Sequence, residues 1–148
     1  MSTETSKEIE NKAILSHLFE ELWSKRNFSV LDEVYSPEVH YQTPSMELHS
    51  LDELKNLFNG HSLAFHDAKV RVNDQIAKDD MVVTKFAFEG VHKGKFEELE
   101  PTGNKIKIEG ITIDRLVNGK IVDEWEVFDE LGMMKQLGLE MKPVEVAH

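Results

Sequence analysis

A carboxylate at the end of an aromatic-rich segment is the side chain in this sequence best suited to acid/base chemistry. Asp129 follows the segment Lys120 to Phe128, in which Trp125 stands four residues before it. A carboxyl group that faces an apolar pocket loses hydration, so its pKa rises and it can exchange protons near neutral pH. Asp is also a common helix N-cap, and a short segment, Glu130 to Gly132, follows directly. Taken alone, the residues leave both roles open.

The segment that carries Asp129 is predicted to be the second strand of a β-hairpin. Asn118-Gly119, a favoured pair for a type I′ turn, separates Lys105 to Val117 from Lys120 to Phe128. With a two-residue turn, residues i and j lie opposite each other when i + j is about 237. Trp125 then lies opposite Thr112, on the same face as Asp129. We therefore expect these three residues to face one pocket, although a β-bulge would change this assignment.

The rest of the chain predicts the elements that enclose such a pocket. Two capping boxes, beginning at Thr5 and Ser50, start amphipathic helices that run to about Lys25 and about Phe65. From Val70 onward, apolar and polar residues alternate with the period of strands. This order predicts an α+β fold, in which N-terminal helices pack on the concave face of a cone-shaped, curved antiparallel sheet.

Composition excludes several classes of function. The 148 residues suggest a single domain, 1–148, and contain 17 Lys+Arg against 28 Asp+Glu, a formal net charge of −11. A surface of this sign disfavours nucleic acid and anionic membranes as partners. The sequence has no Cys, which fits a reducing compartment. Because it also shows neither a signal peptide nor a long apolar run, we expect a cytoplasmic protein.

The segment Gly110 to Gly138 resembles the C-terminal signature of the SnoaL-like polyketide cyclase (ester cyclase) family. The most specific matches are Asn118-Gly-Lys-Ile, Trp125-x-x-x-Asp129 and Leu137-Gly138. Further segments in family order extend the resemblance from Asn11 to Leu139, with a loose tail after Pro143; they are Asn11-Lys-Ala-Ile, 30–37, 90–96 and 101–105.

The resemblance implies a nuclear transport factor two-like α+β cone, often dimeric through the outer face of the sheet. It also implies intramolecular aldol closure of a ring in an aromatic polyketide ester, without metal or cofactor. The family's acid/base Asp matches Asp129. Where many relatives have a His on the first strand, this chain has Gln42, which is expected to face the pocket with its polarity kept and its proton chemistry lost.

Four further residues are candidate substrate contacts, each with a plainer alternative. His92 matches a family position at the pocket rim, or it stabilises a bend between strands. Trp23, Phe19 and Tyr41 line the cavity if the first helix closes the cone, or they are ordinary core residues. The seven histidines show no familiar metal-binding spacing, and His40 and His49 fall in separate elements, so we expect no metal site.

Three hypotheses follow for the function. The first is a cofactor-independent enzyme that acts on a small hydrophobic carbonyl compound, with Asp129 as acid/base and Trp125, Gln42, Tyr41 and His92 around the substrate. The second is a protein that binds such a ligand without turnover, or an isomerase or hydrolase on the same cone. The third is a homodimer whose cavity is filled by side chains.

Overall fold

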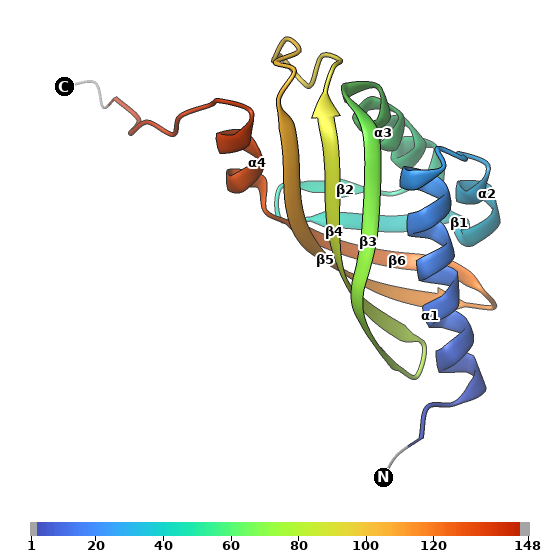
Figure 1. The fold of residues 1–148 in the computed structure, drawn as a ribbon. Coiled ribbons are helices and arrows are strands. Elements are labelled where there is room, and N and C mark those ends of the chain that lie inside the picture. Colours follow the sequence, from blue (N-terminus) through green and yellow to red (C-terminus); the bar gives the residue numbers. More distant parts are fainter. Residues whose placement is uncertain (1–2, 146–148) are drawn as a thin grey trace.

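The structure, a computed structural model, describes residues 3–145. Helical elements dominate up to residue 64, and long strands follow (Figure 1). The helices are α1 (Ser6–Phe19), a π-helical turn η1 (Glu20–Ser24), α2 (Val30–Val34), α3 (Leu51–Ala64) and α4 (Glu130–Gln136). The strands are β1 (Tyr35–Thr43), β2 (Met46–Leu48), β3 (Phe65–Lys78), β4 (Met81–His92), β5 (Lys105–Val117) and β6 (Lys120–Phe128).

The strands form one curved sheet with the order β2-β1-β6-β5-β4-β3. All neighbouring strands are antiparallel except β1 and β6, which run parallel. The expected α+β cone is confirmed, with the difference that its sheet is mixed. β1 and β6 are far apart in the sequence, and the chain between them, from β2 through α3 to β5, supplies the long connection that parallel neighbours need.

The N-terminal helices cover the concave face of this sheet, while α4 lies at the far end (Figure 1). Both predicted capping boxes mark real helix starts: Thr5 accepts a hydrogen bond from the Glu8 backbone N–H, and Ser50 accepts one from Glu53. The helices bury apolar side chains against the strands; these include Leu15, Leu18, Phe19, Leu31, Val34, Leu54 and Phe58. This packing leaves the inner face of β4, β5 and β6 as the wall of the molecule's interior.

The β5–β6 hairpin turns at Asn118-Gly119 as predicted, and both residues have positive φ, 50° and 76°, as a type I′ turn requires. The predicted register, however, holds only beside the turn. Leu116 pairs with Ile121, but Arg115 pairs with Asp123, so Val122 is an extra residue in β6. This β-bulge shifts the rest of β6 by one residue and exchanges which side chains face inward.

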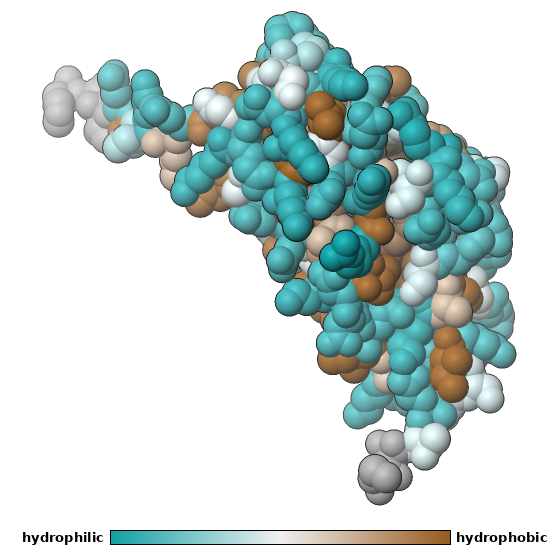
Figure 2. All heavy atoms as spheres, in the orientation of Figure 1, coloured by the Kyte–Doolittle hydropathy of each residue, from teal (hydrophilic) through white to brown (hydrophobic). Residues whose placement is uncertain are grey.

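The face drawn in Figure 2 is mainly hydrophilic, in keeping with the excess of acidic residues. Within residues 3–145, no helix is long and apolar enough to cross a membrane.

Candidate functional site

An aromatic cavity lies between the helices and the inner face of the sheet. It leaves a space of about 70 Å³ for the centres of water-sized molecules, and it is partly open to solvent. Its wall is almost entirely apolar, and Glu126 and His61 are the two titratable side chains among the described residues that line it. The other lining residues are Trp23, Phe65, Phe86, Phe88, Phe96, Ile106, Ile108, Phe128 and Met133.

Glu126 brings a carboxylate into this apolar wall. It lies on β6 opposite Thr112 of β5, on the inner face that the bulge at Val122 creates. Burial, followed by the negative charge of Glu124, raises the pKa of Glu126 to about 7, and a hydrogen bond from Tyr41 opposes this rise. A carboxyl group with a pKa near 7 can both accept and return a proton at neutral pH.

Two tyrosines of β1 hold two glutamates of the neighbouring strand β6. The Tyr41 hydroxyl donates to Glu126 Oε1 at 2.6 Å, and the Tyr35 hydroxyl donates to Glu124 Oε1 at 2.7 Å. Both tyrosines are about 1% exposed, so these hydrogen bonds are shielded from water. Each glutamate therefore has a defined orientation before any ligand binds.

Near Glu126, two acidic residues of β5 and β6 are buried side by side. Asp114 of β5 and Glu124 of β6 are register partners, and both are buried. Burial raises the pKa of Asp114 to about 6. Burial, and next the charge of Asp114, raise the pKa of Glu124 well above its ordinary value. Because two adjacent buried carboxylates resist losing both protons, the pair retains a proton near neutral pH.

His61 of α3 is the second polar side chain of the cavity wall. Its ring stacks against Trp23 with centroids 6.5 Å apart and lies 5.9 Å from the Phe96 ring. Burial lowers the pKa of His61 below its ordinary value, so the imidazole is neutral at physiological pH. A neutral imidazole can donate one hydrogen bond and accept another, which suits it to hold a substrate oxygen.

Trp125 and Gln42 lie on the outer face of the sheet, so the expectation that they face the cavity is wrong. Trp125 is 42% exposed and pairs with Ile113, which is also exposed. Gln42 pairs with Trp125 in the parallel ladder, whereas the buried Tyr41 beside it pairs with Glu124. The bulge at Val122 explains the position of Trp125, and the alternation of side chains along β1 explains that of Gln42.

Asp129 is an exposed residue directly after β6, and its side chain does not face the cavity. Its Oδ1 accepts a hydrogen bond of 2.9 Å from the backbone N–H of Gly132, so Asp129 caps α4. The backbone N–H of Asp129 also donates to the Glu109 carbonyl. Asp129 borders a shallow depression on the outer face with Ile111 and Val127.

The remaining candidates lie inside the protein. Trp23 lines the cavity, and Phe19 supports it from behind, with its ring 5.1 Å from that of Phe86. Thr112 is buried on the inner face between Thr84 and Glu126. His92 is fully buried outside the described cavity wall, where its Nδ1 accepts a hydrogen bond of 3.1 Å from the Thr102 backbone N–H.

The interpretation of the sequence missed the acidic residues of the inner face, Asp114, Glu124 and Glu126, as well as His61. One signal was present: Glu124 and Glu126 alternate with apolar residues at the period of a strand. Glutamates that face solvent produce the same pattern. Only the position of the bulge shows that these two glutamates face the interior.

Comparison with known proteins agrees with this architecture. The family model for SnoaL-like polyketide cyclases matches residues 13–137. AclR from Streptomyces galilaeus, named as a candidate hydroxylase, is 26% identical with a TM-score of 0.81, covering 92% of this chain and 86% of its own. A candidate polyketide cyclase from Acidithiobacillus ferrooxidans is 25% identical with a TM-score of 0.76, covering 93% and 98%.

A third solved structure shares the fold at lower identity. It is a candidate SnoaL-like polyketide cyclase from Jannaschia sp. CCS1, 18% identical with a TM-score of 0.87, covering 95% of this chain and 100% of its own. None of the curated proteins matches the sequence.

Proposed function

Because the chain belongs to the SnoaL-like polyketide cyclase family, we propose that it is an enzyme that acts on a small hydrophobic carbonyl compound by acid/base chemistry without a cofactor. The reaction we propose is an intramolecular aldol-type ring closure. The observation that carries this proposal is Glu126, a carboxyl group with a pKa of about 7 in the wall of an aromatic cavity.

In this reaction Glu126 removes a proton from the carbon next to a substrate carbonyl. The enolate that forms attacks a second carbonyl of the same molecule and closes the ring, and the protonated Glu126 then donates its proton to the new alkoxide. One residue can serve in both steps because its pKa is close to the working pH. The substrate's own conjugation delocalises the enolate charge, so no metal is needed in this scheme.

The neighbours of Glu126 suit these two steps. Tyr41 donates to Glu126 Oε1, so Oε2 is the oxygen that we propose meets the substrate. His61, neutral because of burial, offers a hydrogen bond to a substrate oxygen as charge develops there. The aromatic side chains of the wall limit contact with water and offer ring faces against which a planar ring system can stack.

Asp129, which the family resemblance favours, is the rival acid/base residue. It borders the shallow outer depression near Ile111 and Val127, so a ligand bound there would meet its carboxylate. We favour Glu126 because Asp129 is exposed and its Oδ1 is used to cap α4.

The pair of variants Glu126→Gln and Asp129→Asn tests the assignment. Each change removes a charge but keeps the shape, and Asn also caps helices well. We expect Glu126→Gln to lower kcat on an aromatic polyketide methyl ester by on the order of 100-fold or more, while Asp129→Asn stays within a few-fold of the parent chain. The opposite ranking would place the chemistry at Asp129. Ligand binding by the parent chain without turnover of any ester tested would instead favour a binding protein.

We also propose that the protein is a homodimer through the outer face of β5 and β6. Four large apolar side chains on these neighbouring strands are between 40% and 47% exposed: Ile111, Ile113, Trp125 and Val127. A contiguous apolar patch of this kind is typical of a protein–protein interface. A second copy of the chain would bury it symmetrically.

A further inference from the structure

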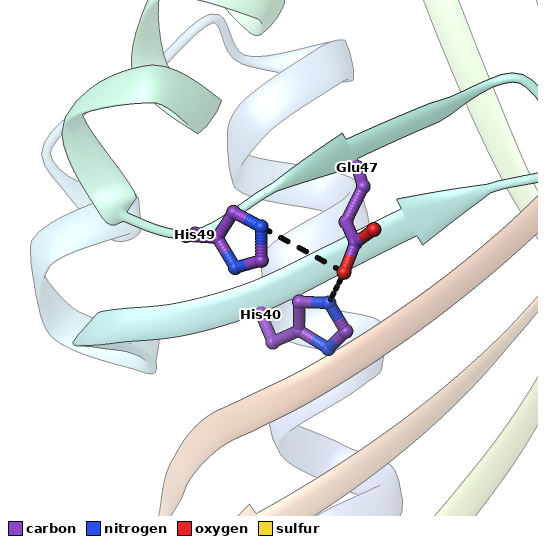
Figure 3. A group of neighbouring side chains, drawn as sticks. All are labelled: His40, Glu47 and His49. Carbon is purple, nitrogen blue, oxygen red and sulfur yellow. Dashed lines mark hydrogen bonds and ion pairs between the residues drawn. The ribbon is translucent and has the colours of Figure 1, made fainter.

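Three side chains with metal-binding atoms meet at the β1–β2 edge of the sheet (Figure 3). His40 Nε2 lies 2.7 Å from Glu47 Oε1, and His49 Nε2 lies 3.7 Å from the same oxygen. The two imidazole rings stack with their centroids 5.2 Å apart. Each residue offers one ligand atom, and the three atoms lie within 4.8 Å of one another.

The hairpin between β1 and β2 brings these residues together. Tyr41 pairs with Leu48 and Gln42 pairs with Glu47, so the next position of the ladder sets His40 opposite His49. Glu47 and His49 are two residues apart and therefore lie on the same face. The two histidines, nine positions apart in the sequence, become neighbours through the turn alone.

We propose that His40, Glu47 and His49 bind a divalent transition-metal cation, with Zn²⁺ as the ion best suited. Two imidazoles and one carboxylate are a common ligand set for zinc, with bonds of about 2.0 to 2.2 Å and a fourth position left for water. Ligand atoms around a tetrahedral zinc ion stand roughly 3.3 Å apart. The observed separations from Glu47 Oε1, 2.7 Å and 3.7 Å, lie on either side of that value, and none of the three side chains is buried.

Asp123 strengthens the proposal because it orients one of the ligands. Asp123 is the register partner of His40 in β6, and its Oδ1 lies 3.3 Å from His40 Nδ1. With Nδ1 turned toward this carboxylate, Nε2 is the nitrogen that faces Glu47 and the proposed ion. Metal-bound histidines are usually held by such a carboxylate, which fixes the ring and raises its affinity for the metal.

The two imidazole nitrogens of this site favour zinc over Mg²⁺ and Ca²⁺. Mg²⁺ and Ca²⁺ prefer oxygen ligands, whereas imidazole suits zinc and its first-row neighbours. The site is also separate from the cavity: His40 lies on the face of β1 opposite to that of Tyr41, whose hydroxyl reaches Glu126. Its occupancy is therefore independent of the acid/base chemistry proposed above.

Titration of the full-length, untagged chain with ZnCl₂ by calorimetry tests the proposal. We expect saturable binding of one Zn²⁺ per chain and no detectable heat with MgCl₂. His49→Ala should weaken Zn²⁺ binding by more than tenfold, and Asp123→Asn by on the order of tenfold, the effect typical of losing a supporting carboxylate. The side chains of His49 and Asp123 are 70% and 54% exposed, so these variants should fold.

His17→Ala is the matched control. His17 Nε2 lies 3.3 Å from Glu33 Oε1, so this exposed pair also joins an imidazole to a carboxylate. Among the described residues, however, the pair is not part of a group of three possible metal ligands. The control should bind Zn²⁺ as the parent chain does. The proposal is overturned if the parent chain shows no saturable binding, if His49→Ala binds as tightly as the parent, or if His17→Ala weakens binding as much as His49→Ala.

Discussion

The Tyr41 hydroxyl donates a hydrogen bond of 2.6 Å to Glu126 Oε1, across the parallel pair β1 and β6. This bond opposes the effect of burial, since it stabilises the ionised carboxylate while the loss of water destabilises it. The pKa of Glu126 near 7 is thus a balance between two opposing causes, and each can be altered separately.

Replacing Tyr41 by Phe should raise the pKa of Glu126 further. The change removes only the hydroxyl, so the carboxylate loses a donor while its burial is unchanged. A hydrogen bond to a charged group contributes about 1.5 to 3 kcal/mol, which corresponds to a rise of about 1 to 2 pKa units. Because Glu126 must be deprotonated to act as the base, the acidic limb of the pH–rate profile reports its pKa. That limb, or the carboxyl ¹³C shift of Glu126, measures the change.

Tyr35→Phe is the matched control for this prediction. This change also removes a hydroxyl group from β1, but the Tyr35 hydroxyl donates to Glu124 rather than to Glu126. We expect a smaller shift at Glu126, transmitted only through the charge of Glu124. An equal shift in the two variants would contradict a specific role for Tyr41.

Stability should fall with rising pH because of Glu126, and Glu126→Gln should remove this effect. The pKa of Glu126 rises from an ordinary 4.5 to about 7 on folding, so the folded chain holds more protons than the unfolded chain between these values. Stability from this group is therefore complete below about pH 4.5 and is lost as pH approaches 7. At pH 8 the Gln variant should be more stable by about 1 to 3 kcal/mol.

Urea unfolding at pH 4.5 and pH 8 measures this difference. The advantage of the Gln variant should be present at pH 8 and small at pH 4.5. Asp129→Asn is the control, because it removes a carboxylate at an exposed helix cap outside the cavity. A Gln variant with the same stability as the parent at pH 8 would mean that Glu126 is solvated in the folded state.

Local sequence signals predicted the elements well. Both capping boxes begin helices, and Asn118-Gly119 forms the turn between strands with the predicted bounds. These features depend on a few adjacent residues whose backbone preferences are strong, so the sequence determines them without knowledge of the rest of the fold.

The site was harder to predict because it depends on one inserted residue. Val122 makes two residues of β6 oppose one of β5, and this exchanges Trp125 for Glu126 on the inner face. Nothing in the residue types around Val122 marks a bulge, since a regular ladder fits the same alternation. The His40–His49 pair was missed for a related reason, because the short β1–β2 turn has no strong turn dipeptide.

The proposed dimer predicts the effect of a charge on the outer face. Trp125→Lys should give a monomer in light scattering at micromolar concentration, because a buried, unpaired ammonium opposes association. Ile76→Lys on β3 is the control, since Ile76 is 65% exposed but lies outside the apolar patch of β5 and β6. A parent chain that is already monomeric, or a Trp125→Lys dimer, would contradict the proposed interface.

Gly110 should be required for the shape of the cavity wall. A Cβ at this position of β5 would lie 2.5 Å from Phe86 Cζ and 2.9 Å from the Val127 carbonyl oxygen. The carbonyl belongs to the backbone of the paired strand and cannot shift without disturbing the ladder, and the Phe86 ring, which packs against Phe19, would have to move into the cavity that it lines. Gly110→Ala should therefore destabilise the fold by about 1 to 3 kcal/mol, the usual effect of overpacking.

Gly60→Ala is the matched control, and it should raise the stability of the fold. Gly60 lies within α3, and nothing lies within 4 Å of a Cβ built there. Ala has the higher helix propensity, so this variant should be more stable by about 0.5 to 1 kcal/mol. Chemical unfolding of both variants measures the contrast. If Gly110→Ala were as stable as the parent chain, the inner face would have room beside Phe86, and the cavity would be less constrained than its packing indicates.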